Sequence, residues 1–217
     1  MIYTSDLRIT EIFHSLQGES RTVGIPTVFV RLTGCPLRCQ YCDTAYAFKG
    51  GHQIPITEIV DMVRNYDCDY VTVTGGEPLA QPQCVNFLKI LCDFGFTVSI
   101  ETCGALLINE VDKRVSIVLD LKTPGSLECD KNNYQNLSYL KKKDQVKFVI
   151  CDRNDYDWSK ARIDQYDIAS KVGDILFSPS YDDLEGQELA NWVLEDRLAV
   201  RLQLQLHKIL WGLEPGR

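Results

Sequence analysis

The chain has 217 residues, of which 45% are hydrophobic and 24% charged, a composition typical of a globular protein with one well-buried core. Its formal net charge of −7 disfavours non-specific binding to nucleic acid or to acidic membranes. The first residues show no signal-peptide pattern, and no apolar run approaches the roughly 18 residues that suggest a membrane-spanning helix. We therefore expect a cytoplasmic protein that forms a single domain over residues 1–217.

Short runs rich in β-branched and aromatic residues recur along the chain and predict strands. They lie at 27–32, 70–74, 97–100, 115–121, 146–150, 175–177 and 200–206. The last run alternates apolar and polar residues, so one face of that strand is expected to lie in water.

Segments with helical periodicity separate several of these strands. Thr57 is a candidate cap for the first helix, Pro82 suits the first turn of a second that Gly95 ends, and 184–195 is a third candidate. Strands that alternate with helices predict parallel βα units. The helices are too few for a full eight-fold barrel.

Three of the nine cysteines fall within eight residues, directly after the strand expected at 27–32. Cys35, Cys39 and Cys42 have the spacing C-x3-C-x2-C, at the end of a strand where α/β folds bind ligands. In a reducing compartment, clustered cysteines bind metal more often than they form disulfides. Three thiolates this close can hold three irons of a 4Fe–4S cluster and leave the fourth iron open to a substrate.

Other interpretations of the cysteine loop stay open at this point. Structural zinc usually takes four ligands as two spaced pairs, and no second C-x2-C pair occurs, although His52 would complete a site of three cysteines and one histidine. A disulfide is disfavoured because three neighbouring cysteines cannot all pair. The other six cysteines, at 68, 84, 92, 103, 129 and 151, are expected to be buried, inert thiols.

A second motif follows the strand expected at 70–74. Gly75 and Gly76 allow the backbone to approach a ligand, and the carboxylate of Glu77 suits an ammonium group. Together with the cysteine loop, the run Thr-Gly-Gly-Glu-Pro at 74–78 resembles the radical S-adenosylmethionine superfamily. Proteins of that superfamily use such a run to hold the amino group of the methionine moiety.

A narrower resemblance covers most of the chain and is to the 7-carboxy-7-deazaguanine synthase family, also called QueE. It is carried by Phe-His-Ser-Leu-Gln-Gly-Glu at 13–19, Phe-Val-Arg-Leu-Thr-Gly-Cys at 29–35, Cys-Asp-Thr at 42–44, Ile-Glu-Thr at 100–102 and Gln-Leu-His-Lys at 205–208. The resemblance implies an α/β fold, a partial, modified (βα) barrel of the radical S-adenosylmethionine type with about six parallel strands. It also implies a homodimer.

The same resemblance implies an activity. The substrate would be 6-carboxy-5,6,7,8-tetrahydropterin, converted to 7-carboxy-7-deazaguanine with loss of ammonia in queuosine and deazapurine biosynthesis. Hydrogen would be abstracted from C6 of the pterin, and S-adenosylmethionine would be re-formed in each cycle. Mg²⁺ and an electron donor of the flavodoxin or ferredoxin type would also be needed.

Roles for individual residues are implied as well. The expected substrate contacts are Leu16, Gln17, Gly18, Arg31, Thr74 and the terminal Arg217. The expected S-adenosylmethionine contacts are Tyr41, Cys42, Asp43, Gly76, Glu77, Asp120, Leu121, Lys122, Ser178 and Pro179. Cys35, Cys39 and Cys42 would bind the cluster, and Thr44 would bind Mg²⁺. At 120–122 the chain has Asp-Leu-Lys where the family has Ser-Pro-Lys.

Simpler roles compete with some of these. Arg31 would otherwise form a surface ion pair, and Thr44 would otherwise hydrogen-bond the turn after Asp43. A glycyl-radical activating enzyme can share the cysteine loop, but it needs a protein partner and leaves the motifs at 16–19 and 42–44 unexplained. A non-catalytic iron–sulfur or zinc module needs no second ligand site, which the run at 75–78 supplies.

Overall fold

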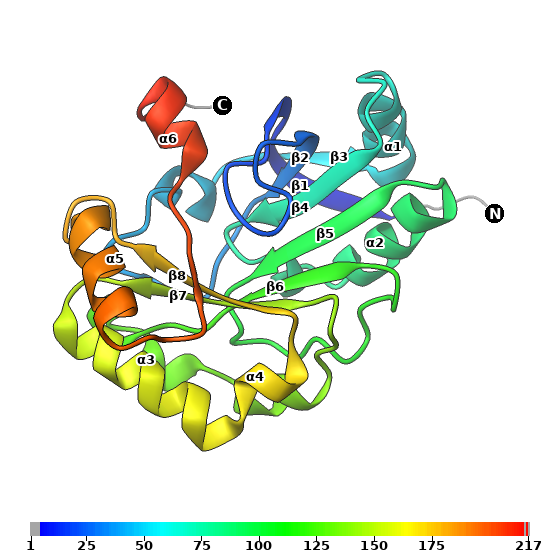
Figure 1. The fold of residues 1–217 in the computed structure, drawn as a ribbon. Helices are drawn as coiled ribbons and strands as arrows, with labels where there is room; N and C mark the ends of the chain where they lie inside the picture. The colour runs from blue at the N-terminus through cyan, green and yellow to red at the C-terminus, as the bar shows by residue number, and fades with distance from the viewer. Residues whose placement is uncertain (1–4, 215, 217) are drawn as a thin grey trace.

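The computed structural model describes residues 5–214 and 216, and one nine-stranded sheet runs through this part of the chain (Figure 1). The strands are β1 (Asp6–Leu16), β2 (Pro26–Leu32), β3 (His52–Pro55), β4 (Tyr70–Gly75), β5 (Thr97–Thr102), β6 (Ser116–Asp120), β7 (Gln145–Ile150), β8 (Asp174–Pro179) and β9 (Arg201–Leu202). Their order is β3-β1-β2-β4-β5-β6-β7-β8-β9. β1 is antiparallel to both neighbours, and every pair from β2 to β9 is parallel. The sheet is open, with β3 and β9 at its edges.

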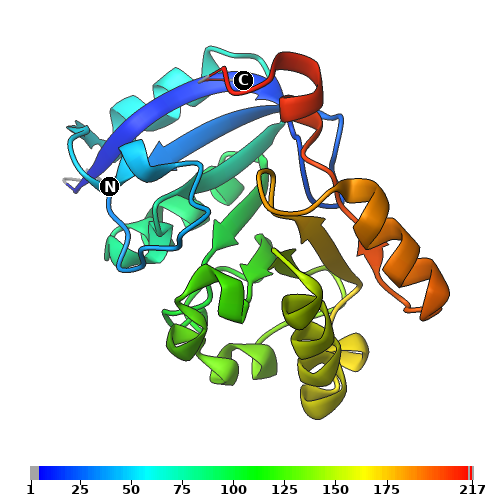
Figure 2. The same ribbon diagram turned by 90° about the vertical axis from the view of Figure 1, so that its left-hand side faces the viewer.

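Helices cover the outer face of the curved sheet (Figure 2). They are α1 (Ile56–Arg64), α2 (Cys84–Asp93), α3 (Arg153–Tyr166), α4 (Ile168–Lys171) and α5 (Gly186–Glu195). The last helix, α6 (Leu206–Trp211), lies instead at the cavity, which His207 and Lys208 line. Short 3-10 helices occur at Ala45–Phe48, Pro78–Ala80, Pro124–Ser126, Cys129–Lys131 and Tyr134–Ser138. α1 packs on β1 and β3, α2 on β5, α3 on β7, and α5 on β8 and β9. None of the helices in the described part has the length and apolar composition that a membrane crossing requires.

Alternation along the strands separates the core from the ligand side of the sheet. In β4, Val71 and Val73 join the hydrophobic core, whereas Thr72 and Thr74 point to the opposite face. Thr74 lines the main cavity, and the hydroxyl of Thr72 accepts a hydrogen bond from Gln17 at 3.1 Å. Polar residues at every second position of a buried strand therefore mark the side where ligands can bind.

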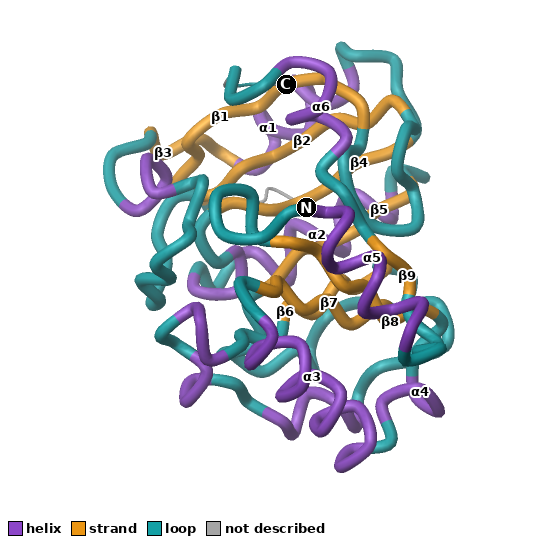
Figure 3. The backbone as a smooth tube through the Cα atoms, turned by 60° about the vertical axis from the view of Figure 1, so that its left-hand side comes forward, coloured by secondary structure: helices purple, strands orange, loops and turns teal. Residues whose placement is uncertain are grey.

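Six of the seven predicted strands are present, as β2 and β4 to β8. The prediction for 200–206 is wrong over most of its length, because β9 ends at Leu202 and α6 begins at Leu206. The chain leaves the sheet after Gln203 and crosses to the loop between β1 and β2, where the amide of Leu206 donates to the carbonyl of Gly18 at 2.9 Å (Figure 3). Thr57 does not cap α1, which begins at Ile56.

β1 and α3 are the longest of the elements that have no counterpart among the sequence predictions. β1 carries charged and polar residues along most of its length, so it lacks the apolar run that reveals a buried strand. α3 is polar except for a narrow stripe that includes Tyr156 and Ile163. Its start is marked by Asp152, whose carboxylate accepts a hydrogen bond from the amide of Asp155 at 2.8 Å.

Candidate active site

A cavity of about 560 Å³ lies at the carboxyl ends of the parallel strands. Its floor takes two residues from each of six strands, namely Phe29 and Arg31, Thr74 and Gly75, Glu101 and Thr102, Val118 and Asp120, Lys147 and Val149, and Ser178 and Pro179. The cysteine loop, the β1–β2 loop and the C-terminal segment from 205 onward form its walls. Parallel α/β sheets bind their ligands at this edge.

The cysteine loop brings Cys35, Cys39 and Cys42 to the same cavity, and all three thiols are free. Burial raises the pKa of Cys39 to about 11 and raises the pKa of the other two thiols as well. The metal-free thiols are therefore protonated at neutral pH and release protons when they bind metal. Three sulfurs without a fourth protein ligand are the donor set that suits a 4Fe–4S cluster with one open iron.

The zinc alternative is not supported by this arrangement. His52 lies in β3 at the edge of the sheet and does not line the cavity. Across residues 5–214 and 216, no three His, Cys, Asp or Glu side chains come together as they would around a single metal ion.

The Gly75–Gly76 turn packs directly against the cysteine loop. A Cβ atom on Gly76 would collide with the carbonyl of Gly34 and with the side chain of Cys35, and Gly75 has a φ of +147°. The amide of Glu77 donates to the carbonyl of Gly34 at 2.7 Å. Glycine is therefore required here for a close approach between two loops that both border the cavity.

The side chain of Glu77 does not reach the cavity. It is fully buried, and its carboxylate accepts hydrogen bonds from the hydroxyl of Thr102 at 2.9 Å and from the amides of Leu79 and Cys103 at 2.9 and 2.6 Å. The carboxylate therefore ties the end of β4 to the end of β5. The structure assigns Glu77 to the support of the glycine turn and does not place its carboxylate where an ammonium group in the cavity would meet it.

Residues from β6 and the cysteine loop offer unpaired polar groups to the cavity. Lys122 Nζ donates to Asp120 Oδ2 at 2.9 Å and lies 5.8 Å from the centre of the Tyr41 ring. Within the described part of the chain, Asp120 Oδ1 and the Tyr41 hydroxyl are buried and have no hydrogen-bond partner. Buried polar atoms are rarely left unpaired, so an acceptor and a hydroxyl aimed at one cavity fit a polar ligand such as S-adenosylmethionine.

The other expected S-adenosylmethionine contacts divide into two groups. Tyr41, Cys42, Asp43, Gly76, Asp120, Lys122, Ser178 and Pro179 all line the cavity. Leu121 does not, because its side chain is fully buried in the hydrophobic core, and its contact with S-adenosylmethionine stays a prediction.

The predicted substrate residues within the described part come from the β1–β2 loop and from the ends of β1, β2 and β4. Leu16, Gln17, Gly18, Arg31 and Thr74 all line the cavity, whereas Arg217 lies outside the described residues. The side-chain amide of Gln17 donates to Glu101 Oε1 at 3.4 Å as well as to Thr72. A Cβ on Gly18 would collide with the ring of His207, so glycine allows the C-terminal segment to close over the β1–β2 loop.

Arg31 forms an ion pair, but not at the surface. Its side chain is only 16% exposed, and its Nε donates to Glu11 Oε1 at 2.6 Å. The Tyr46 hydroxyl donates to the same oxygen at 2.8 Å, and the Tyr46 and Phe13 rings lie 5.8 and 5.7 Å from the guanidinium. No described residue accepts a hydrogen bond from the two terminal nitrogens, which leaves a planar pair of donors for a ligand carboxylate.

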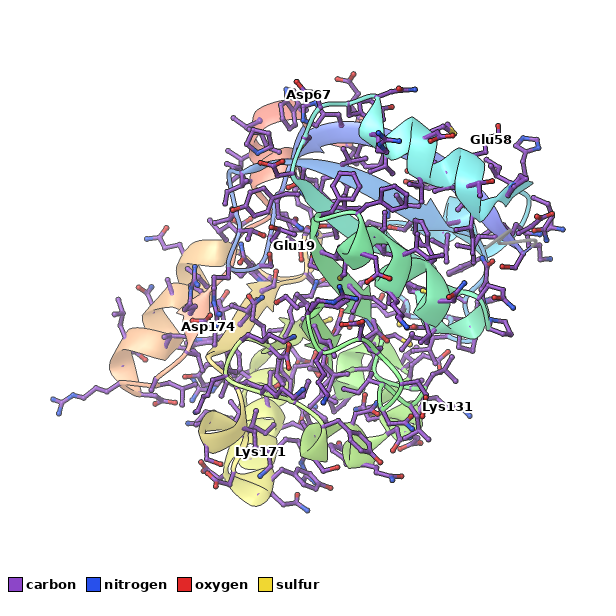
Figure 4. All side chains as sticks on the ribbon, turned by 90° about the vertical axis from the view of Figure 1, so that its right-hand side faces the viewer. Glu19, Glu58, Asp67, Lys131, Lys171 and Asp174 are labelled. Carbon is purple, nitrogen blue, oxygen red and sulfur yellow. The ribbon has the colours of Figure 1, made fainter. Side chains whose placement is uncertain are left out.

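Three charged residues that line the cavity, Glu19, Glu101 and Lys147, were not assigned a role from the sequence. Lys147 Nζ lies 2.6 Å from Glu19 Oε2 and 3.8 Å from Asp120 Oδ2, and Gln205 donates to Glu19 Oε1 at 2.6 Å. Figure 4 shows Glu19 toward the middle of the molecule, whereas Glu58 and Lys131 lie at its margins. The sequence did contain a signal for Lys147, because a charged residue in a strand that is buried on both faces is unusual.

The buried charges shift one another's pKa values. Burial alone would raise the pKa of Glu19, but the ammonium of Lys147 holds it below its usual range. Burial and the neighbouring Glu19 carboxylate raise the pKa of Glu101, the third unassigned group. The pKa values of these two neighbouring carboxyl groups are therefore shifted in opposite directions.

Thr44 lies on the cavity wall and donates its hydroxyl hydrogen to Asp43 Oδ1 at 2.8 Å. The other carboxylate oxygen of Asp43 accepts from Lys208 Nζ at 2.9 Å. Burial would raise the pKa of Asp43, but Lys208 holds it well below its usual range. Thr44 therefore makes a local hydrogen bond to Asp43, as the alternative to a Mg²⁺-binding role predicts. Together with Asp43 it also offers the oxygen ligands that Mg²⁺ prefers.

Comparison with known proteins agrees with this geometry. The model of the Radical SAM superfamily matches residues 29–144. Two proteins called 7-carboxy-7-deazaguanine synthase are each 43% identical to this chain, one from Koribacter versatilis over 94% of this chain and 97% of its own, and one from Chlorobaculum tepidum over 95% and 94%. One from Thermoplasma acidophilum is 37% identical over 96% of this chain and 99% of its own.

A solved structure shows the same fold. The crystal structure of QueE from Escherichia coli matches with a TM-score of 0.74 over 93% of this chain and 95% of that one, at 21% identity. The predicted α/β fold, a partial (βα) barrel of the radical S-adenosylmethionine type, is thereby confirmed, and its sheet is open and mostly parallel. The chain is an enzyme of the radical S-adenosylmethionine superfamily and belongs, within it, to the 7-carboxy-7-deazaguanine synthase family.

Proposed function

We propose that the chain converts 6-carboxy-5,6,7,8-tetrahydropterin to 7-carboxy-7-deazaguanine with loss of ammonia. The observation that carries this proposal is one cavity lined both by the three free cysteines and by Arg31, whose terminal nitrogens have no acceptor among the described residues. A volume of about 560 Å³ lies within the usual range for ligand sites. The names of the relatives support the choice of product.

The cofactor side of the cavity is assigned to Cys35, Cys39, Cys42 and the Gly75–Gly76 turn. A 4Fe–4S cluster held there would supply the electron for reductive cleavage of S-adenosylmethionine. Asp120 Oδ1 and the Tyr41 hydroxyl, both unpaired among the described residues, would hydrogen-bond polar groups of that cosubstrate.

The substrate side of the cavity is assigned to Arg31, Gln17 and Glu101. The terminal nitrogens of Arg31 would bind the substrate carboxylate as a planar fork, while Glu11 fixes the orientation of the guanidinium through Nε. A pterin edge presents several N–H donors and ring acceptors in one plane. Glu101 and Gln17, which hydrogen-bond each other at 3.4 Å, offer acceptors and donors to such an edge.

The C-terminal segment would exclude water from both sides. Gln205, His207 and Lys208 line the cavity, and Leu206 donates its amide hydrogen to Gly18 on the substrate wall. Radical chemistry needs a closed site in which side reactions are suppressed. This segment would therefore order over the bound ligands and hold them in place.

The remaining parts of the proposal follow from the family resemblance. Mg²⁺ would bind at Thr44, with the substrate and water supplying its other oxygens. The reductant would be a flavodoxin or ferredoxin, and the enzyme would work as a single-domain homodimer in the cytoplasm. Exposed apolar side chains on and beyond α6, Ile209, Leu210 and Leu213, support self-association. The net charge of −7 supports the absence of nucleic acid and membrane partners.

An anaerobic assay tests the proposal. The reconstituted enzyme is incubated with the carboxy-tetrahydropterin, S-adenosylmethionine, Mg²⁺ and dithionite, and the product is identified by mass. We expect 7-carboxy-7-deazaguanine from the wild type and none from Cys39→Ala. Release of 5′-deoxyadenosine without this product would point to another radical enzyme, and release of neither would point to a non-catalytic binding module.

A further inference from the structure

The carboxylate of Asp43 is shared between the cysteine loop and the C-terminal segment. Its Oδ1 accepts from the Thr44 hydroxyl at 2.8 Å, and its Oδ2 accepts from Lys208 Nζ at 2.9 Å and from Gln205 Nε2 at 3.4 Å. The side chain of Asp43 is 46% exposed to the cavity, whereas that of Lys208 is only 8% exposed. A fixed ammonium therefore lies next to the residue proposed to bind Mg²⁺.

The position of Lys208 is determined from several directions. Its Nζ lies 4.8 Å from the centre of the Tyr181 ring, a favourable cation–π contact. Lys208 belongs to α6, whose first residue, Leu206, hydrogen-bonds Gly18. The ammonium is therefore a compact positive charge at a defined position, whereas the side chain of an exposed lysine samples many conformations.

We propose that Lys208 sets the affinity of the Thr44 site for a divalent cation, because its ammonium and the cation share the carboxylate of Asp43. This inference rests on the proposed Mg²⁺ site. Two positive charges beside one carboxylate repel each other, so each weakens the binding of the other. Water screens a buried ammonium less than an exposed one, so the repulsion persists at physiological salt. Without a divalent ion, Lys208 neutralises Asp43 and keeps α6 on the cysteine loop.

Binding of Mn²⁺, measured by electron paramagnetic resonance, tests this inference without turnover. The anaerobic holoenzyme is kept with its cluster oxidised and EPR-silent, in the presence of S-adenosylmethionine and the carboxy-tetrahydropterin, and the signal of free Mn²⁺ is followed during titration. Lys208→Met removes the charge but keeps the length of the side chain, and we expect it to bind Mn²⁺ about tenfold more tightly than the wild type. Lys208→Arg and the exposed control Lys131→Met should bind as the wild type does.

A double variant shows whether the tighter binding of Mn²⁺ arises at the Thr44 site. In Thr44→Val/Lys208→Met the tenfold gain should disappear, because the cation has lost its protein hydroxyl. Equal or weaker binding by Lys208→Met, or a gain that persists without Thr44, would overturn the inference.

Product formation by the same wild-type preparation is measured separately. A wild type that forms the product while neither it nor Lys208→Met binds Mn²⁺ would keep the proposed function and overturn the role of Lys208. If the chain forms no product but Lys208→Met still binds Mn²⁺ tenfold more tightly than the wild type, the role of Lys208 is kept and the proposed function is overturned.

Discussion

Arg31 shows how a single residue gains a role from its neighbours. Glu11 accepts from Nε, and the Phe13 and Tyr46 rings flank the guanidinium, so its plane is fixed before any ligand binds. A preoriented fork loses less conformational entropy when it binds a carboxylate. Sequence analysis identified Arg31 from its motif but not Glu11, because residues of two different strands meet only through the β1–β2 pairing.

Arg31→Lys is therefore expected to be a severe change. Lysine keeps the positive charge but cannot present two coplanar donors, so kcat/KM for the pterin should fall about ten- to hundredfold. Cleavage of S-adenosylmethionine without the pterin should be unaffected, since Arg31 belongs neither to the cysteine loop nor to the expected S-adenosylmethionine contacts. Steady-state kinetics and 5′-deoxyadenosine release measure the two effects, and unchanged kinetics with the pterin would refute this role of Arg31.

The cysteines make a second prediction at this scale. Cys35, Cys39 and Cys42 line the cavity and belong to one loop. Of two other cysteines, Cys103 also lines the cavity but follows β5, and Cys68 does not line it. Replacing any of the first three with Ala should abolish the reduced-cluster signal in electron paramagnetic resonance. Cys68→Ala and Cys103→Ala should keep it. Loss of the signal in either of these two variants would show that the set of ligands is larger than three.

At the scale of elements, the open sheet is bridged by polar contacts on its ligand side. Glu19, on the β1–β2 loop, reaches Lys147 on β7 and Gln205 after β9. Arg21 on the same loop pairs with Asp174, the first residue of β8, at 2.6 Å. The loop between the first two strands therefore contacts the far half of the sheet, and together with α6 it closes the cavity that the sheet leaves open.

The Lys147–Glu19 pair should contribute strongly to stability only as a pair. Lys147→Met leaves Glu19 buried without its counter-charge, so the free energy of unfolding should fall by about 3–5 kcal/mol, as measured by urea denaturation at neutral pH. Lys147→Met/Glu19→Gln, which removes both charges, should recover a large part of that loss. The exposed control Lys131→Met should change stability by less than about 0.5 kcal/mol. A loss of that small size in Lys147→Met would mean that the pair is not a structural contact.

Local pattern predicted the central strands well because each is a short apolar run between turns. The elements at both ends of the chain were harder to predict. β1 has exposed and half-buried polar residues along its length, so it lacks the apolar run typical of a buried strand. The alternation at 200–206 is typical of a strand, although only Arg201 and Leu202 pair with β8. Here a tertiary contact, the hydrogen bond from the Leu206 amide to the Gly18 carbonyl, fixes the path of the chain after β9.

At the scale of the whole molecule, the sequence could predict some residues of the site but not others. Contiguous motifs revealed the cysteine loop, the glycine turn and the 16–18 wall, because their residues are neighbours along the chain. The roles of Lys147, Glu19 and Lys208 depend on strand order and on the path of the C-terminal segment, which no local pattern encodes. Burial likewise placed Glu77 and Leu121 behind the cavity wall although both belong to recognisable motifs.

The central claim is that one cavity holds S-adenosylmethionine and the pterin close enough for direct hydrogen transfer between them. The most direct measurement uses carboxy-tetrahydropterin carrying deuterium at C6, incubated anaerobically with the reduced enzyme. We predict that 7-carboxy-7-deazaguanine forms and that deuterium appears at the 5′ carbon of recovered S-adenosylmethionine, as detected by mass spectrometry. Formation of the product with no deuterium in S-adenosylmethionine or 5′-deoxyadenosine would contradict the claim.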